Sequence, residues 1–211
     1  AYFSDPAQGD VPAPRSFLDG DRSKFPEVGQ LQSLDFPKIE RAKLKNGMEL
    51  YFSRRATVPT VQVSVSFDVG YAADPKSALG TQSLMLSMMS EGTKNRSSTE
   101  LAIAKERLGA NISASADLDN TYFYLSALKL NLRPSLELLA DFIRNPAFDG
   151  KELDRVRARQ LSGIAAELKD PSSIGRRVLL PELYGKAHPY GVPPSGSGQP
   201  TVVAKLSSAD L

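Results

Sequence analysis

Apolar and polar residues alternate most regularly between positions 61 and 69 of the chain. Every second residue there is apolar: Val61, Val63, Val65, Phe67 and Val69 alternate with Gln62, Ser64, Ser66 and Asp68. Side chains of a strand point alternately to its two faces, so this period of two predicts a strand with one buried face. Positions 111–116 and 120–128, the second rich in tyrosine and phenylalanine, predict two more strands.

A β-hairpin is expected nearer the N-terminus. Lys43 to Lys45 and Met48 to Ser53 flank Asn46-Gly47. This dipeptide supplies the positive φ angles of a two-residue turn between antiparallel strands. We therefore predict two short strands joined at Asn46-Gly47.

Five later segments have helical spacing of their apolar residues. The first covers residues 79–90, and the second begins with a capping box of Ser97 and Glu100 and ends at Gly109. The third runs from Pro134 to Asn145 and the fourth from Asp149 to about Lys169. A shorter fifth segment begins at Asp170-Pro171. Pro181 is expected to bend or end the last helix. Met85, Met88 and Met89 lie at helical spacing, which favours core packing over a soft-metal or peptide-binding surface.

Antiparallel strand pairs with helices between them predict an α+β fold, an antiparallel or mixed sheet with helices packed mainly on one face. Residues 1–37 are rich in proline and polar residues and are expected to be a linker or leader, and 38–211 the domain. Ser207 to Leu211 has residues that open a helix, so we expect the domain to be truncated there. The Gly-, Pro- and Ser-rich stretch 191–200 is expected to be a flexible loop.

Composition narrows the classes of function. The 211 residues carry a formal net charge of +2 and include no cysteine. Nucleic acid is therefore not an implied partner, and disulfides, thiolate catalysis and cysteine-ligated metals are excluded. We expect no membrane span, because no stretch approaches the roughly 20 apolar residues that a bilayer requires. The compartment stays open, with the periplasm slightly favoured over the cytoplasm.

His188 is the one histidine, so a two-histidine metal site is ruled out and a Ser-His-Asp arrangement would depend on this residue alone. We expect a loop histidine with local hydrogen bonds. Turn and capping roles account for the carboxylates in the most suggestive places, which are Asp117, Asp119, Glu152, Glu167 and Asp170.

Several short motifs, read in order, resemble the pitrilysin/insulinase/mitochondrial-processing-peptidase family of zinc metallopeptidases. They are Leu44-Lys45-Asn46-Gly47-Met48, Phe67-Asp68-Val69-Gly70 with Ala73-Asp74, Glu106-Arg107-Leu108-Gly109-Ala110, Asn145-Pro146-Ala147-Phe148, Leu183-Tyr184-Gly185 and His188-Pro189-Tyr190-Gly191. The resemblance implies the metallopeptidase LuxS/MPP-like fold and makes His188 a family loop residue.

The resemblance also implies where catalysis should lie. Active members carry His-x-x-Glu-His on a helix, closely followed by Gly-Thr, and a third zinc ligand, a glutamate, roughly 75 residues further on. Here Ser83 and Ser87 stand at the histidine positions, Leu86 at the catalytic glutamate, and Ser162 or Gly163 at the third ligand. Serine is a poor zinc ligand and leucine cannot act as a base. Glu91 lies five residues past Leu86, off the required face.

We therefore expect neither catalytic nor metal-binding residues in this chain. The resemblance implies a non-catalytic domain from the second half of a two-part bacterial chain. Such a domain helps to enclose extended peptide substrates for an active partner half or subunit of the same family. The zinc would be bound by that partner. One alternative is a purely structural subunit, like the core proteins of respiratory complexes. The other is a hydrolase that uses Ser83 or Ser87 with His188.

Overall fold

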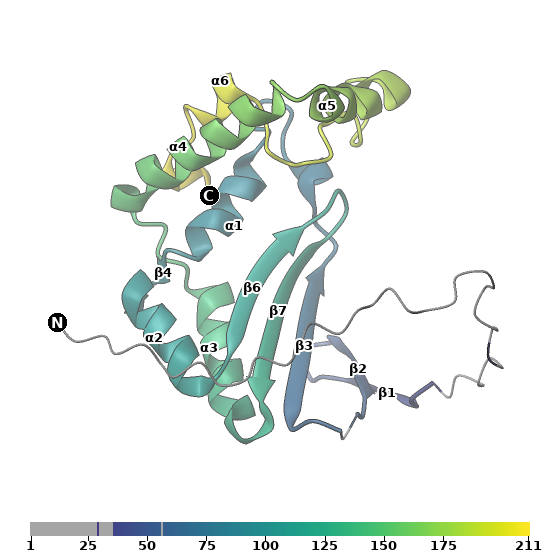
Figure 1. Ribbon diagram of the computed structural model, residues 1–211, viewed down its shortest axis with the longest axis vertical. Helices are drawn as coiled ribbons and strands as arrows, with labels where there is room; N and C mark the ends of the chain where they lie inside the picture. Colours follow the sequence, from purple (N-terminus) through teal and green to yellow (C-terminus); the bar gives the residue numbers. More distant parts are fainter. Residues whose placement is uncertain (1–28, 30–35, 56) are drawn as a thin grey trace, which may run out of the picture. The chain divides into compact units, whose positions relative to one another are not determined.

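The computed structural model describes residues 29, 36–55 and 57–211 (Figure 1). The chain divides into two units at Arg55, and each is described by itself. The expected linker or leader over 1–37 lies almost wholly outside the described residues, so its assignment stays a prediction.

The first unit is a hairpin of β1 (Ile39–Lys43) and β2 (Glu49–Ser53), which pair antiparallel with Ile39 opposite Ser53. Its turn differs from the predicted two-residue turn. Leu44 N donates to Met48 O and Gly47 N to Leu44 O, which leaves three residues in the loop. Gly47 has a φ of 89° and Asn46 has no positive φ. A two-residue turn of this kind needs positive φ at both central residues, so the chain forms the longer loop instead.

The second unit is built on a sheet with the strand order β3-β7-β6, all antiparallel. The strands are β3 (Thr60–Phe67), β6 (Asn111–Ala116) and β7 (Thr121–Leu128). In β7 the residues Phe123, Leu125 and Ala127 are buried, whereas Tyr122 and Tyr124 stack on the opposite face with ring centroids 5.9 Å apart. In β3 the predicted alternation holds in part: Val61, Val63 and Val65 are half-buried between exposed polar residues, whereas Phe67 (40% exposed) and Val69 (53% exposed) do not belong to a buried face.

Helices α1 (Thr81–Met89), α2 (Ser98–Leu108) and α3 (Leu132–Arg144) cover the core face of this sheet. A second apolar cluster joins Leu84 and Met88 of α1 to Val156 and Ile164 of α4 (Gly150–Glu167). Helix α1 thus lies between the sheet and α4 (Figure 1). The α+β prediction is confirmed. Met88 and Met89 are buried, as a core role requires.

Shorter elements complete the second unit. They are β4 (Gly92–Thr93), β5 (Arg96–Ser97), α5 (Pro171–Tyr184), α6 (Pro200–Val203) and the 3-10 turns Tyr71–Ala73, Lys129–Asn131 and Ser208–Asp210. Helix α5 does not end at Pro181 as one prediction allowed. It continues to Tyr184. A proline removes only one backbone hydrogen bond from a helix, and Gly185 N still donates to the carbonyl of Pro181.

A buried carboxylate ties the small β4-β5 hairpin to α3. Asp141 accepts hydrogen bonds from Thr93 Oγ1 (2.8 Å), Asn95 Nδ2 (2.5 Å), Arg96 Nη1 (2.6 Å) and Asn145 Nδ2 (2.9 Å). Burial alone would raise the pKa of Asp141, but these donors outweigh it and hold the pKa below its ordinary value. The charged form is therefore the one that this part of the fold requires.

Segment 191–199 is packed, contrary to the expected flexible loop. Val192 is 1% exposed, and Gly191, Pro193, Gly196 and Gly198 are buried as well. Gly198 lies against the backbone of Leu79 and Gly80. The glycine content of this stretch had favoured a flexible loop. In the structure, the lack of side chains on these glycines lets the segment pack directly against α1.

Candidate functional site

The site implied by the sequence lies on α1, whose first turn is anchored by Asp74. Its carboxylate accepts from Gly80 N (2.9 Å) and Gln82 N (3.2 Å). Ser83 and Ser87, one helical turn apart, share the face that looks toward α4. Leu86 is 8% exposed and belongs to the core cluster against the sheet.

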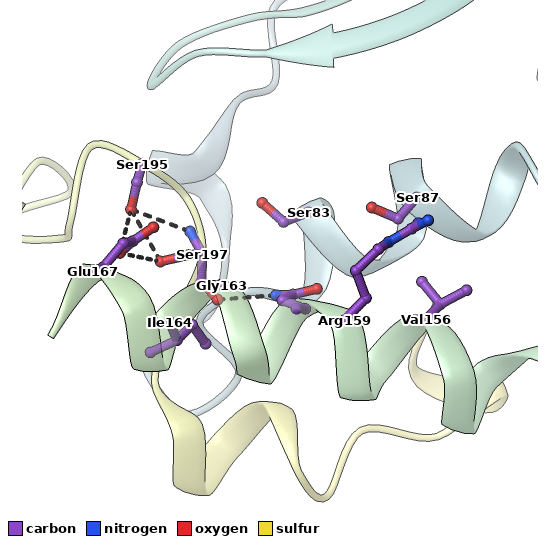
Figure 2. A pocket seen from close by; sticks show the side chains of 10 residues that line it. Ser83, Ser87, Val156, Arg159, Gly163, Ile164, Glu167, Ser195 and Ser197 are labelled. Atoms are coloured by element: carbon purple, nitrogen blue, oxygen red, sulfur yellow. Dashed lines mark hydrogen bonds between the residues drawn. The ribbon is translucent and has the colours of Figure 1, made fainter. Parts of the chain in front are cut away.

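Two adjoining cavities lie on this face of α1. One, of about 210 Å³, separates it from α4 and is lined by residues that include Ser83, Ser87, Gln160 and Gly163 (Figure 2). The other, of about 470 Å³, reaches β6 and is lined by Tyr71, Ser83, Leu86, Ser87, Ser90, Glu91, Ala114, Ser115 and Arg159. Ser83, Ser87 and Arg159 line both, so we call the pair the α1/α4 cleft.

Of the two residues expected at the third ligand position, the structure brings Gly163 into the cleft. Ser162 is exposed and lines neither cavity. A Cβ built on Gly163 meets nothing within 4 Å, so the cleft is open at this point. Ser83, Ser87, Leu86 and Gly163 are therefore the residues that gather where the resemblance places the site.

These four residues do not fit a zinc ion. Two hydroxyls, an alkyl chain and a residue without a side chain offer no imidazole, thiolate or carboxylate. Within the described part of the chain, no group of three or more His, Cys, Asp or Glu residues is placed to hold a metal. No catalytic step that runs through zinc can be built on the residues at this position.

Ser83 is engaged by the packed segment 191–199. Its Oγ donates to Gly196 O at 2.7 Å. Gly196, at a φ of 64°, lies so close to the Tyr71 ring that a Cβ at this position would overlap it. Gln160 Nε2 of α4 donates to Ser197 O (2.9 Å) and to Gly80 O (3.1 Å). The segment therefore closes one end of the cleft.

Hydrogen bonds from Arg177 fix the same segment to α5, and an ion pair joins Arg177 to Glu167 at the end of α4. Arg177, whose side chain is 10% exposed, donates to Glu167 Oε2 (2.5 Å), Ser197 Oγ (2.6 Å) and Gly198 O (2.6 Å). Ser195 and Ser197 both donate to the same Glu167 carboxylate (Figure 2). Glu167 was expected only to occupy a helix end, and it is in fact the acceptor at the centre of this network.

Two arginines of α4 approach the two carboxylate oxygens of Glu91. Arg155 Nη2 donates to Glu91 Oε2 at 2.5 Å, while Arg159 Nη2 stays 3.9 Å from Glu91 Oε1. Hydrogen bonding to Glu152, helped by the charge of Glu91, raises the pKa of Arg155. Glu91 lines the larger cavity together with Leu86, but it lies beyond the end of α1 and its carboxylate is bonded to Arg155, so it does not take the place of Leu86 on the helix. The helix ends at Met89, and the chain beyond it turns Glu91 back toward α4.

His188 lies apart from the two serines. Its ring stacks on Tyr184 with centroids 5.0 Å apart, and Nδ1 accepts from Tyr190 N at 3.0 Å. It lines neither cavity, and the Ser83 hydroxyl already donates to a carbonyl. The structure therefore gives no support to a Ser-His hydrolase.

Among the remaining carboxylates, Asp117 and Asp170 have local roles, whereas Asp119 accepts from Tyr190 Oη at 2.7 Å, 71 positions further along the chain. Asp117 accepts from Asn120 N and Asp119 N in the β6-β7 turn, and these amides lower its pKa. Asp170 accepts from Ser173 N and caps α5. Sequence reasoning missed Arg159 and Gln160 as cleft residues, although Arg159 precedes Gly163 by four positions and so shares its helix face.

Comparison with known proteins places these features in context. A sequence model of the insulinase family, peptidase family M16, matches residues 51–186. Subunit 1 of the mitochondrial cytochrome b-c1 complex of Bos taurus is 30% identical over 183 residues, which cover 86% of this chain and 36% of that protein. Mitochondrial-processing peptidase subunit alpha of Solanum tuberosum is 30% identical over 156 residues, covering 73% and 30%. This chain thus spans about a third of the length of these curated relatives.

The fold is shared with a solved structure. The peptidase M16 inactive domain from Pseudomonas fluorescens superposes with a TM-score of 0.75 at 24% identity, over 82% of this chain and 41% of that one. Among residues 29, 36–55 and 57–211, no helix combines the length and the apolar character needed to cross a membrane.

Proposed function

This chain belongs to the insulinase family, peptidase family M16, and on that basis we propose that it is a non-catalytic domain that helps to enclose and position extended peptides for an active partner of the family. The observation that carries the proposal is the residue set Ser83, Leu86, Ser87 and Gly163. It cannot hold zinc or activate water, yet it still lines an open cleft.

The sheet supports a role in holding peptides. Strand β6 pairs with β7 along one edge, and no described strand pairs with its other edge. Ala114 and Ser115 of β6 line the larger cavity. An extended peptide that pairs with this edge through its backbone would lie along the cleft, and backbone pairing tolerates many sequences.

The partner in this proposal is a zinc-bearing domain or subunit of the same family, in the same polypeptide or a separate one. Relatives of this chain include subunits named alpha and beta of mitochondrial-processing peptidase. We place the zinc and the catalytic glutamate in that partner, because Ser83, Leu86, Ser87 and Gly163 can supply neither a zinc ligand set nor a general base.

The test is peptidase activity with parallel zinc analysis, on the chain alone and mixed with its zinc-bearing partner. We expect no activity and no stoichiometric zinc for the chain alone, and a higher kcat/KM for the mixture than for the partner alone. Stoichiometric zinc, or zinc-dependent cleavage by the chain alone, would overturn the proposal.

A purely structural subunit is the second candidate, favoured by the 30% identity to subunit 1 of the cytochrome b-c1 complex. The same mixture separates the two functions. A structural subunit would bind its partner and leave the partner's kcat/KM unchanged.

A further inference from the structure

Arg159 is a cationic side chain that lines both cavities of the α1/α4 cleft, together with the carboxylates of Glu91 and Glu167. It projects from α4 and ends beside Ser87 of α1 (Figure 2). It is shared by the two cavities, and the absent side chain of Gly163, one turn further along α4, leaves open space next to it. A guanidinium in this position therefore has room for a second molecule.

The hydrogen-bonding groups of Arg159 are not used by the described part of the chain. Glu91 is 3.9 Å away, beyond hydrogen-bond distance, and its carboxylate is already held by Arg155 at 2.5 Å. Arg155 also bonds Glu152 at 2.9 Å. An incoming anion at Arg159 would thus displace no hydrogen bond, although Glu91 stays within ion-pair distance of the guanidinium.

Residues with hydroxyl groups line the same cavity as Arg159. The Ser87 hydroxyl has no hydrogen-bond partner among the described residues, and Ser90 and Ser115 line the cavity on the sides of α1 and β6. A carboxylate has two oxygens that match the two parallel N–H groups of an arginine, and a serine hydroxyl can donate to a remaining lone pair. The cleft thus offers several donors around one cation.

We propose that Arg159, with Ser87, binds the carboxylate of a peptide lying in the α1/α4 cleft. The inference rests on the proposed peptide-positioning function and specifies the chemistry that the cleft selects. The carboxylate is either the C-terminus of the peptide or an acidic side chain. Because β6 borders the cleft, a peptide paired with its free edge brings such a group to Arg159.

The first test uses the full chain and three fluorescent, N-acetylated peptides in an anisotropy titration. One is an Ala/Ser hexamer with a free C-terminus, the second is its C-terminal amide, and the third is the amide with one Glu. We expect a carboxylate-bearing peptide to bind about fivefold to tenfold more tightly than the plain amide, as a partly exposed charge-assisted pair allows. Whether the free acid or the Glu peptide gains identifies the source of the carboxylate.

Matched variants assign the effect to one side chain. Arg159→Gln should remove the preference, and Ser87→Ala should reduce it. Arg133→Gln removes a charge from a side chain that is 92% exposed on α3 and should keep it. Arg159 is 60% exposed and makes no hydrogen bond to the described residues, so Arg159→Gln should fold normally.

A second measurement needs no peptide. Acetate, but not acetamide, should shift the Nε–H resonance of Arg159 in a ¹H–¹⁵N spectrum, and Arg133 should serve as the unshifted reference. Equal binding of all three peptides, or no response to acetate, would overturn the carboxylate site. The proposed function fails separately, if the chain leaves its partner's kcat/KM unchanged.

Discussion

The hydroxyl of Ser83 donates a hydrogen bond of 2.7 Å to the backbone carbonyl of Gly196, 113 positions further along the chain. Ser83 stands where the resemblance places a zinc-binding histidine. Its side chain therefore belongs to the packing of segment 191–199 on α1, and the two serines at the former ligand positions differ in role. Both line the cleft, but only the Ser83 hydroxyl is bonded to segment 191–199, whereas the Ser87 hydroxyl has no partner among the described residues.

Removing each hydroxyl separately tests this difference. Ser83→Ala leaves the Gly196 carbonyl without its partner, so we expect the free energy of unfolding to fall by about 1 kcal/mol. Ser87→Ala should change it by less than about 0.5 kcal/mol, as for a site without a bonded partner. Urea unfolding of both variants measures the two values. Equal losses would show that the Ser83 bond contributes nothing specific.

The contact between Gly196 and Tyr71 makes a second prediction. Gly196→Ala places a Cβ against the Tyr71 ring at a positive φ, so we expect a loss of about 2–4 kcal/mol, combining overpacking with left-handed strain. In a Tyr71→Ala background the overlap is gone and only about 1 kcal/mol of backbone strain should remain. A thermodynamic cycle from denaturant unfolding measures the coupling. The same cost in both backgrounds would mean that the ring does not limit residue 196.

Much of the fold followed from local patterns. The alternation at Val61, Val63 and Val65, the Ser97 capping box and the Asp149 cap each act through neighbours a few positions away, so the sequence alone specifies them. Short-range patterns also predicted the hairpin, but not its three-residue loop, because that depends on the φ that Asn46 adopts.

The site was predictable only in part. The motif positions Ser83, Leu86 and Ser87 follow from the resemblance, and their shared helix places them together. The choice between Ser162 and Gly163 needed the rotation of α4 about its axis, which its contacts with α1 determine. The packing of segment 191–199 depends on contacts with Arg177, Tyr71 and Ser83. These residues lie far from the segment in the sequence, so its local Gly- and Pro-rich pattern could not predict the contacts.

Arg177 gives a third prediction. Arg177→Met should destabilise the chain by about 2–3 kcal/mol, because Glu167 loses its charged partner and two further hydrogen bonds to the segment are lost. Backbone amides of 191–199 should exchange with deuterium faster, Gly196 among them. Arg176→Met, at the exposed neighbouring position, is the control and should leave exchange unchanged. Unaltered exchange in Arg177→Met would contradict this account of the segment.

Asp141 gives a prediction in pH. Its hydrogen-bond donors hold the pKa of Asp141 in the folded state below its pKa in the unfolded state. The contribution of Asp141 to the stability of the fold is therefore complete above the ordinary aspartate pKa near 3.9. It is lost as the pH falls through the folded-state pKa. Asp141→Asn should therefore be less stable than the parent by about 2–3 kcal/mol at pH 7. The two should converge below about pH 4. Thermal unfolding across this range tests it, and a constant difference down to pH 3 would contradict it.

Segment 191–199, held on α1 by Ser83 and on α5 by Arg177, has an evolutionary consequence. A single change of Ser83 to histidine would break a bond that stabilises the fold and press an imidazole against Gly196, before any metal could compensate. Leu86→Glu would likewise place a carboxylate in the apolar core. Each first step toward the zinc-binding motif lowers stability without completing a metal site, so a zinc site here would require several coordinated substitutions and a shift of the segment.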